Sequence, residues 1–291
     1  MAEAPLCPAP DPDPHAPAFA VPPLACDCHV HVFGPQYPYQ EERSYTPPDA
    51  PVHRLRHLHD NLGLTRAVIV QASVHGTDNT AVLDAVATDP ERFRGVAAVG
   101  EDVTDAELER LNAGGIRGVR LNLVDKGGMP FSSLASVRAF ADRIRDMGWH
   151  VELLVHVEQS DELADLVRTL SVPVSVGHVG YTKAGAGIDH PGYQRFLDLL
   201  RDGYCWVKLT GPYRISAREA FPYDDVKPFA EAVVTAAPDR IVWGSDWPHV
   251  LHYKPMPNDG DLLDSLAEWV PDPRQRQKIL VDNPATLYGF D

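Results

Sequence analysis

Two histidines, His29 and His31, stand one residue apart in the apolar stretch ACDCHVHVF. Successive side chains of a β-strand point to opposite faces, so an extended chain here directs both imidazoles to one side. The same alternation predicts that Asp27 shares the side of the histidines and that Cys26 and Cys28 face the other way. Converging imidazoles can bind a divalent metal ion or polarise a carbonyl group directly.

Further polar side chains stand where other apolar, β-branched runs end. A carboxylate that faces several imidazoles can take a proton from water, which suits hydrolysis or hydration of an activated carbonyl. No Ser or Cys stands in a nucleophile-elbow sequence, which favours direct attack by water over a covalent intermediate. The polar residues at these run ends are Ser73, His75, Arg120, His156, His178, Arg214 and Asp246.

Strand-like runs alternate with helical patterns from residue 25 onward. The predicted strands are Ala25–Val32, Arg66–Gln71, Gly95–Val99, Gly118–Leu121, His150–His156, Val172–Gly177, Cys205–Leu209 and Arg240–Gly244. The predicted helices include Asn79–Thr88, Asp105–Ala113, Leu134–Met147, Ser160–Leu170, Gln194–Asp202 and Tyr223–Ala236. This α/β alternation predicts a single-domain (β/α)8 TIM barrel over residues 25–291, with its chemistry at the carboxyl ends of the strands. An open doubly wound sheet is disfavoured, because no Gly-rich phosphate loop follows the first strand.

Residues 1–24 are rich in proline and predict an extended N-terminal arm. They lack the basic start and apolar core of a secretion signal, and no run approaches the length of a membrane span, so we expect a cytoplasmic protein. The net charge of −15 and the pI of about 5.2 argue against nucleic acid and membranes as partners. The cysteines are Cys7, Cys26, Cys28 and Cys205; they form no C-x-x-C pair and are expected to be reduced core thiols.

Three segments resemble a known family. HVH in the first strand, GH after the sixth and GSDWPH after the eighth look like the amidohydrolase superfamily, in its amidohydrolase-2 branch. DCHVHVFGP, CWVKLTGPYRIS and VWGSDWPH are most similar to 2-pyrone-4,6-dicarboxylate lactonases and their relatives, which include sulfomuconolactone hydrolases. The resemblance implies a (β/α)8 barrel and a hydrolase of a carboxylic ester, which opens an anionic lactone during the degradation of aromatic compounds.

The resemblance also assigns roles to residues. In the pyrone lactonases the aspartate of the last strand is the general base, a role that falls on Asp246. The histidines that hold and polarise the lactone carbonyl match His29, His31 and His178. Arginines that bind the substrate carboxylates match Arg120 and Arg214. Ser73, His75 and Tyr45 look like further substrate contacts.

Two positions depart from the lactonase pattern. Lys126 stands where the pyrone lactonases carry a second arginine, and a lysine offers a point charge in place of a two-pronged contact. We therefore expect this protein to recognise a different anion from that of the pyrone lactonases, for instance a sulfonate or a differently placed carboxylate.

His156 is the second departure. Other superfamily members use a fifth-strand histidine as a metal ligand, whereas the pyrone lactonases lack it and need no metal. An inward His156 would complete a Zn or Mn site with His29, His31 and Asp246; an outward one would leave no obligatory cofactor.

Three other functions compete with the hydrolysis of an anionic lactone. A metal-dependent decarboxylase of an unsaturated or aromatic acid belongs to the same branch and would require the metal. A sugar lactonase would need hydroxyl-binding groups more than the three cations Arg120, Lys126 and Arg214. A non-catalytic binder of an acidic metabolite would not need a base that faces the carbonyl site. We expect a monomer or a small homo-oligomer.

Overall fold

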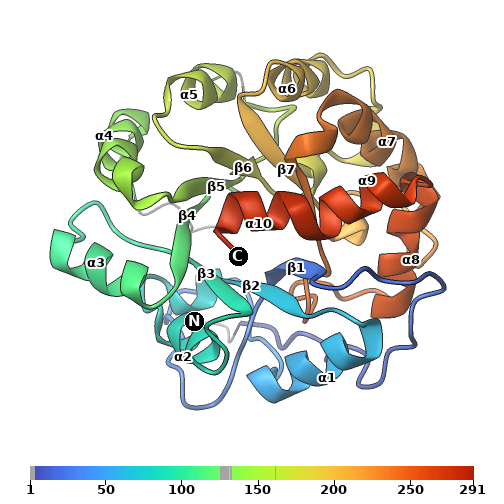
Figure 1. Cartoon of the computed structure of the whole chain (residues 1–291), viewed down its shortest axis with the longest axis horizontal. Coiled ribbons are helices and arrows are strands. Elements are labelled where there is room, and N and C mark those ends of the chain that lie inside the picture. The colour runs from blue at the N-terminus through green and yellow to red at the C-terminus, as the bar shows by residue number, and fades with distance from the viewer. Residues whose placement is uncertain (1–3, 125–130, 132, 161) are drawn as a thin grey trace.

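The computed structural model describes residues 4–124, 131, 133–160 and 162–291. Eight parallel strands lie side by side in chain order and alternate with helices, which cover the outside of the sheet (Figure 1). The fold is therefore the predicted TIM barrel, nearly closed. The strands are β1 Cys26–Val30, β2 Arg66–Val70, β3 Phe93–Ala97, β4 Ile116–Asn122, β5 His150–Leu154, β6 Val174–Val176, β7 Cys205–Thr210 and β8 Ile241–Gly244.

The α-helices follow the strands around the barrel. They are α1 Val52–Leu62, α2 Thr80–Ala87, α3 Asp105–Ala113, α4 Leu134–Ile144, α5 Leu163–Thr169, α6 Pro191–Arg201, α7 Lys227–Ala236, α8 Asp259–Trp269, α9 Pro273–Gln277 and α10 Asn283–Tyr288. None of the helices in the described ranges is both long and apolar enough to cross a bilayer.

The first and last strands meet directly beneath the site. The backbone N–H of Asp246 donates to His29 O at 2.9 Å, and the N–H of His31 donates to Trp247 O at 2.9 Å. A Cβ on Gly244 would lie 2.7 Å from the nitrogen of His29, so only glycine lets β8 approach β1 this closely.

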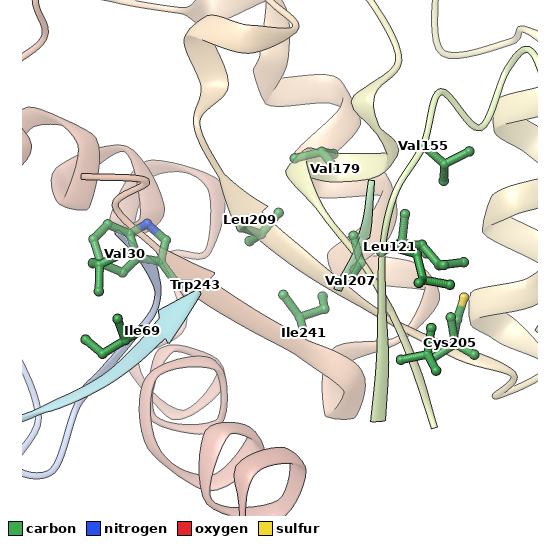
Figure 2. Close-up of a cluster of buried hydrophobic side chains, with 14 of the residues drawn as sticks. Val30, Ile69, Leu121, Val155, Val179, Cys205, Val207, Leu209, Ile241 and Trp243 are labelled. Atoms are coloured by element: carbon green, nitrogen blue, oxygen red, sulfur yellow. The ribbon is translucent and has the colours of Figure 1, made fainter. Parts of the chain in front are cut away.

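Apolar side chains pack on both sides of the sheet. The outer cluster fills the layer between strands and helices and includes Val30, Ile69, Leu209, Ile241 and Trp243 (Figure 2). The inner cluster packs β-strand side chains against α10, the red helix that lies across the barrel in Figure 1; it contains Cys26, Cys28, Val68, Val70, Val96, Val242 and Tyr288. All the cysteines are buried free thiols, as the sequence predicted.

The predicted alternation along the first strand is wrong. The three steps from Asp27 to Val30 on β1 match only two steps on β2, so β1 carries one extra residue. Asp27 points outward, where its Oδ2 lies 3.5 Å from Nε2 of His59 on α1. Cys28 instead packs in the inner cluster, and His29 also faces inward, toward β7 and β5. The irregular register thus places the histidines on the side of the cysteines.

Each predicted strand differs from the structure by one or two residues at one end or both, and β3 and β5 show why. β3 begins at Phe93, two residues before the predicted start, because Phe93 already pairs with Ala67 of β2. β5 ends at Leu154, which pairs with Asn122, and not at His156. The last inward position of β5 is therefore a leucine.

Residues 4–24 run along the barrel surface without a helix or a strand of their own. Their N-terminal end pairs with the segment before α1: the N–H of Cys7 donates to Thr46 O and the N–H of Thr46 donates to Pro5 O, each at 2.8 Å. The N–H of Leu251 donates to the thiol sulfur of Cys7 at 3.2 Å. The arm thus binds two loops, around residues 46 and 251.

Candidate active site

A small cleft opens at the carboxyl ends of the strands. It brings together seven residues that the sequence predicted for the site, namely His31, Tyr45, Ser73, Arg120, His178, Arg214 and Asp246. Leu154, Tyr181, Val250 and Leu251 complete the wall. His29 lies just below the floor of this cleft, with its ring centroid 5.0 Å from that of His31 and 5.1 Å from that of His178.

Asp246 is fully buried and uses its two oxygens differently. Oδ2 accepts a hydrogen bond from the hydroxyl of Tyr213 at 2.7 Å and another from Nε of Arg214. Oδ1 has no hydrogen-bond partner in the described part of the chain. It lies 3.6 Å from Nε2 of His29 and 3.9 Å from Nε2 of His31. One oxygen is therefore anchored and the other is available to a ligand or a water molecule.

The electrostatic surroundings keep Asp246 ionised. Burial alone would raise the pKa of its carboxyl group, but the charge and hydrogen bond of Arg214 hold that pKa well below its usual range. Gly211, with φ of +52°, permits this approach, because a Cβ there would lie 2.8 Å from Oδ2 of Asp246. Asp246 and His178 themselves adopt positive φ, of 66° and 47°. Such backbone strain is concentrated at functional sites.

The surroundings of His29, His31 and His178 favour the neutral form of each ring. Burial and the charge of Arg120 lower the pKa of His31 to about 3. Burial, with the charge of Arg214, lowers the pKa of His178 to about 3 against the opposing effect of Asp246. Burial and the charge of Lys208 lower the pKa of His29 well below its ordinary value. Each ring therefore has one N–H donor and one bare nitrogen.

Hydrogen bonds to the backbone and to β7 orient two of these rings. Nδ1 of His31 lies 2.8 Å from Val70 O. Nδ1 of His178 lies 2.7 Å from the hydroxyl of Thr210. In both rings Nδ1 is therefore engaged, which leaves Nε2 for the cleft.

A buried ion pair that sequence reasoning missed lies under the histidines. Lys208 of β7 and Glu152 of β5 are both almost completely buried and form a close ion pair. Nζ of Lys208 also lies 3.2 Å from Nδ1 of His29. A sequence signal existed, because each charge interrupts an otherwise apolar strand, CWVKLT and HVELL.

A second buried chain supports Asp246 from the opposite side. The hydroxyl of Tyr213 lies 2.9 Å from Nδ1 of His249, and Nε2 of His249 lies 3.2 Å from Oδ1 of Asp259. All of these side chains are buried. Sequence reasoning missed them too: Tyr213 and His249 stand in the quoted GPYR and DWPH segments, but only the fold brings Asp259, at the start of α8, next to them.

Two arginines give the acidic protein a local cationic cleft. Arg120 is anchored by a 3.1 Å hydrogen bond from Nη1 to Gln71 O, while its Nε has no partner among the residues described. Arg214 binds Asp246 and donates from Nη2 to Val250 O at 3.1 Å. Lys126, the third predicted cation, lies outside the described residues.

Two predicted residues lie away from the cleft wall. His75 donates from Nδ1 toward Pro38 O at 2.9 Å, and its ring stacks on Phe33 at 5.7 Å between centroids. Nδ1 of His156 lies 2.9 Å from Tyr181 O, and its ring packs on the ring of Tyr181.

A metal ion could be held by three of the site residues. One ligand atom each of His29, His31 and Asp246 lies within 4.8 Å of the other two. His29 Nε2 and Asp246 Oδ1 have no hydrogen-bond partner within the described ranges. Because Zn²⁺ binds nitrogen and oxygen at about 2.0–2.2 Å, this spacing fits a single ion. His156 is not part of the group.

The arrangement as a whole suits hydrolysis of an anionic carbonyl compound. An ionised carboxylate with one open oxygen can take a proton from water. Imidazoles next to it can donate to, or accept from, the reacting atoms. Arginines on the cleft wall can bind the carboxylate or sulfonate groups of a ligand.

Comparison with known proteins shows the family of this chain. The amidohydrolase family model (Amidohydro_2) matches residues 26–290. The chain belongs to this family of enzymes.

Two curated relatives are similar over almost their whole length. A 4-sulfomuconolactone hydrolase of Rhizobium radiobacter is 40% identical, covering 94% of this chain and 92% of the relative. A 2-pyrone-4,6-dicarboxylate hydrolase of Comamonas testosteroni is 40% identical, covering 95% of this chain and 93% of the relative.

A solved structure has the same fold. It is a probable 2-pyrone-4,6-dicarboxylic acid hydrolase of Acinetobacter baumannii with citric acid bound, 32% identical, with a TM-score of 0.81. The match covers 92% of this chain and 100% of that structure.

Proposed function

We propose that this protein hydrolyses a lactone that carries carboxylate or sulfonate groups, such as 2-pyrone-4,6-dicarboxylate or a sulfomuconolactone, to the open-chain acid. The observation that carries the proposal is the buried, ionised Asp246, which lines a cleft with two arginines and whose Oδ1 has no hydrogen-bond partner among the described residues. The names of the curated relatives support the same substrate class.

Arg120 and Arg214 anchor the anionic groups of the substrate in this proposal. Both line the cleft, and Ser73 and Tyr45 offer hydroxyl groups along the same wall. Lys126 adds a further cation if it faces the cleft. The citric acid in the related Acinetobacter structure shows that a similar protein accepts a polycarboxylate, which supports an anionic ligand here.

Asp246 acts as the general base. Its Oδ1 takes a proton from a water molecule, and the hydroxide oxygen bonds to the lactone carbonyl carbon. His29, His31 and His178 surround the reacting atoms and stabilise the charge that develops on the carbonyl oxygen. The ring C–O bond then breaks, and the proton held by Asp246 passes to the departing oxygen. One water molecule is consumed and Asp246 is regenerated, and the products are one hydroxyl or enol and one carboxyl group.

We propose further that this reaction needs no obligatory metal. Arg214 and Tyr213 already engage Oδ2 of Asp246, and the cations Lys208, Arg120 and Arg214 disfavour another positive charge among the histidines. If a Zn or Mn ion binds, His29, His31 and Asp246 hold it, and it supplies Lewis-acid polarisation of the carbonyl.

The decisive assay is ultraviolet absorbance on a panel of carboxylated and sulfonated pyrones and muconolactones, with and without a chelator. We expect ring opening of at least one carboxylated or sulfonated member, at the same rate in both conditions. Turnover of uncharged sugar lactones alone would contradict the substrate class. Loss of all ring opening with chelator, restored by Zn²⁺, would contradict the metal-independent reaction and show a metal-dependent hydrolysis instead.

A further inference from the structure

Lys208 lies completely buried inside the barrel, directly beneath the H-x-H pair. Its ammonium group has three neighbours that can accept hydrogen bonds. Cys28 O lies 2.8 Å from Nζ, and Nδ1 of His29 lies 3.2 Å away. The third neighbour is the carboxylate of Glu152, which is in close contact.

The number of donors matches the number of acceptors. An ammonium group has three N–H donors and no lone pair, so it can only donate to these neighbours. Nδ1 of His29 must therefore accept from Lys208. A neutral imidazole with a bare Nδ1 carries its single proton on Nε2. This nitrogen lies 3.6 Å from Oδ1 of Asp246, a residue that lines the cleft.

His31 has the opposite arrangement. Its Nδ1 lies 2.8 Å from Val70 O, and a carbonyl oxygen can only accept. The proton of neutral His31 is therefore on Nδ1, and its Nε2, 3.9 Å from Oδ1 of Asp246, is bare. The two histidines thus present one donor and one acceptor to the cleft.

We propose that Lys208 is a positioning residue that fixes His29 as a hydrogen-bond donor to the lactone carbonyl oxygen, while His31 accepts a hydrogen bond from the attacking water. The roles in turnover rest on the proposed function; the position of the proton on His29 does not. Lys208 acts through His29 and does not touch the reacting atoms.

The same contact opposes metal binding. Oε1 of Glu152 lies 3.5 Å from Nδ1 of His29. Without the lysine, this carboxylate would accept the proton of Nδ1, and Nε2 would become bare. A carboxylate–histidine pair of this kind is the usual support of a metal-bound histidine. Lys208 therefore keeps His29 a donor and makes it a poor metal ligand.

Nitrogen NMR on the wild-type protein with ¹⁵N-labelled histidine tests the proposal directly. The His29 and His31 signals are assigned from the His29→Gln and His31→Gln variants. We expect a protonated Nε2 and a bare Nδ1 for His29, and the reverse for His31. A protonated Nδ1 on His29 would overturn the proposal. This readout needs no substrate, so failure of the proposed lactonase activity leaves it intact.

The variant Lys208→Met tests the link to metal and turnover. We expect the His29 proton to move to Nδ1. The zinc affinity, measured by equilibrium dialysis, should rise at least tenfold. In steady-state kinetics, kcat should fall by a larger factor than KM changes. Unchanged His29 nitrogen signals in the folded variant would refute the role of Lys208. Lys227→Met, on the exposed surface of α7, is the matched control and should change none of these quantities.

If Lys208→Met does not fold, the double variant Lys208→Met/Glu152→Leu removes both charges, which a buried site tolerates better than one unpaired charge. His29 should then lose its exclusive Nε2 protonation. Retention of exclusive Nε2 protonation in the double variant would overturn the proposal.

Discussion

Arg120 and Arg214 both line the cleft but have different hydrogen-bond partners, so substitution of each arginine should change the kinetics differently. Arg214 binds Oδ2 of Asp246, whereas Arg120 is anchored to Gln71 O and lies on the cleft wall without contact to that carboxylate. In the proposed reaction, Arg214 therefore supports the base as well as the substrate, whereas Arg120 binds the substrate alone.

We therefore predict different kinetics for the two arginine variants. Arg120→Met should raise KM about tenfold or more, with kcat little changed, because a charged hydrogen bond contributes about 1.5–3 kcal/mol to binding. Arg214→Met should raise KM and also lower kcat, because Asp246 loses its anchor. Steady-state kinetics on the best lactone of the panel measures both. Equal kcat values for the two variants would exclude Arg214 as a support of Asp246.

The sequence could predict site residues that follow a strand more readily than charged residues that lie inside one. Asp246 and His178 follow apolar runs, and the strand-end rule of barrels locates such residues without knowledge of packing. Lys208 and Glu152 stand within strands, where a charge becomes interpretable only once its partner on a distant strand is known. Alternation within each strand is a local property, but ion pairing across the barrel is not.

At the scale of elements, the extra residue in β1 decides which side chains face the site. A strict period of two would have taken Asp27 inward with the histidines. The irregular register between Asp27 and Val30 turns Asp27 toward His59 and leaves its Oδ1 to accept from the N–H of Ser245 at 3.0 Å. The sequence ACDCHVHVF carries no local signal, such as a glycine, that would have indicated this irregularity.

The end of β5 has a similar consequence. Sequence periodicity extended this strand to His156, but strand pairing ends at Leu154, which lines the cleft. Beyond that point the backbone leaves the sheet, so alternation no longer gives the direction of a side chain. His156 instead contacts Tyr181, a contact that only the fold creates.

The N-terminal arm is an element with a testable role. It binds Thr46 through backbone hydrogen bonds, next to the cleft residue Tyr45. It also binds Leu251, whose N–H donates to the thiol sulfur of Cys7. Deletion of residues 1–8 should raise KM about fivefold, with a smaller effect on kcat, because each lost hydrogen bond costs about 1 kcal/mol of loop order. Asp13→Asn, farther along the arm at exposed contacts with α1, is the control and should keep KM unchanged. A truncated protein with wild-type KM would show that the arm does not order the site.

At the scale of the whole molecule, buried neutral histidines link stability to pH. Burial lowers the pKa of His31 and His178 to about 3 and that of His150 to about 4, and His29 is lowered as well. The unfolded chain binds protons at these residues near pH 6.5, whereas the folded protein does not. Acidification below that pH therefore favours the unfolded state, by up to about 1.4 kcal/mol per histidine and pH unit.

We predict that the free energy of unfolding falls by at least about 2 kcal/mol between pH 7 and pH 5. Urea unfolding at the two pH values measures this difference. His150→Gln, which lies outside the cleft, should show a smaller fall than the wild type. An unfolding free energy that is the same at pH 7 and pH 5 would rule out neutral buried histidines as the cause of acid lability.

The architecture itself was the most predictable feature. Eight strand-like runs alternating with helices specify a barrel because each unit can bury its apolar faces in only a few ways. Strand limits were less certain, since they depend on pairing with neighbours, as Phe93 with Ala67 shows. The arginines near strand ends predicted a cationic cleft inside an acidic protein. The contacts that support Asp246, through Tyr213 and His249, could be found only in the assembled fold.

The kinetics of Asp246→Asn test the central claim most directly. With the lactone that the wild type opens best, and in the presence of chelator, kcat should fall about 1,000-fold, within the range for loss of a general base. KM should remain within about threefold, because the isosteric amide keeps the shape of the cleft. A variant that keeps kcat within tenfold of the wild type would contradict the assignment of Asp246 as the base that activates water.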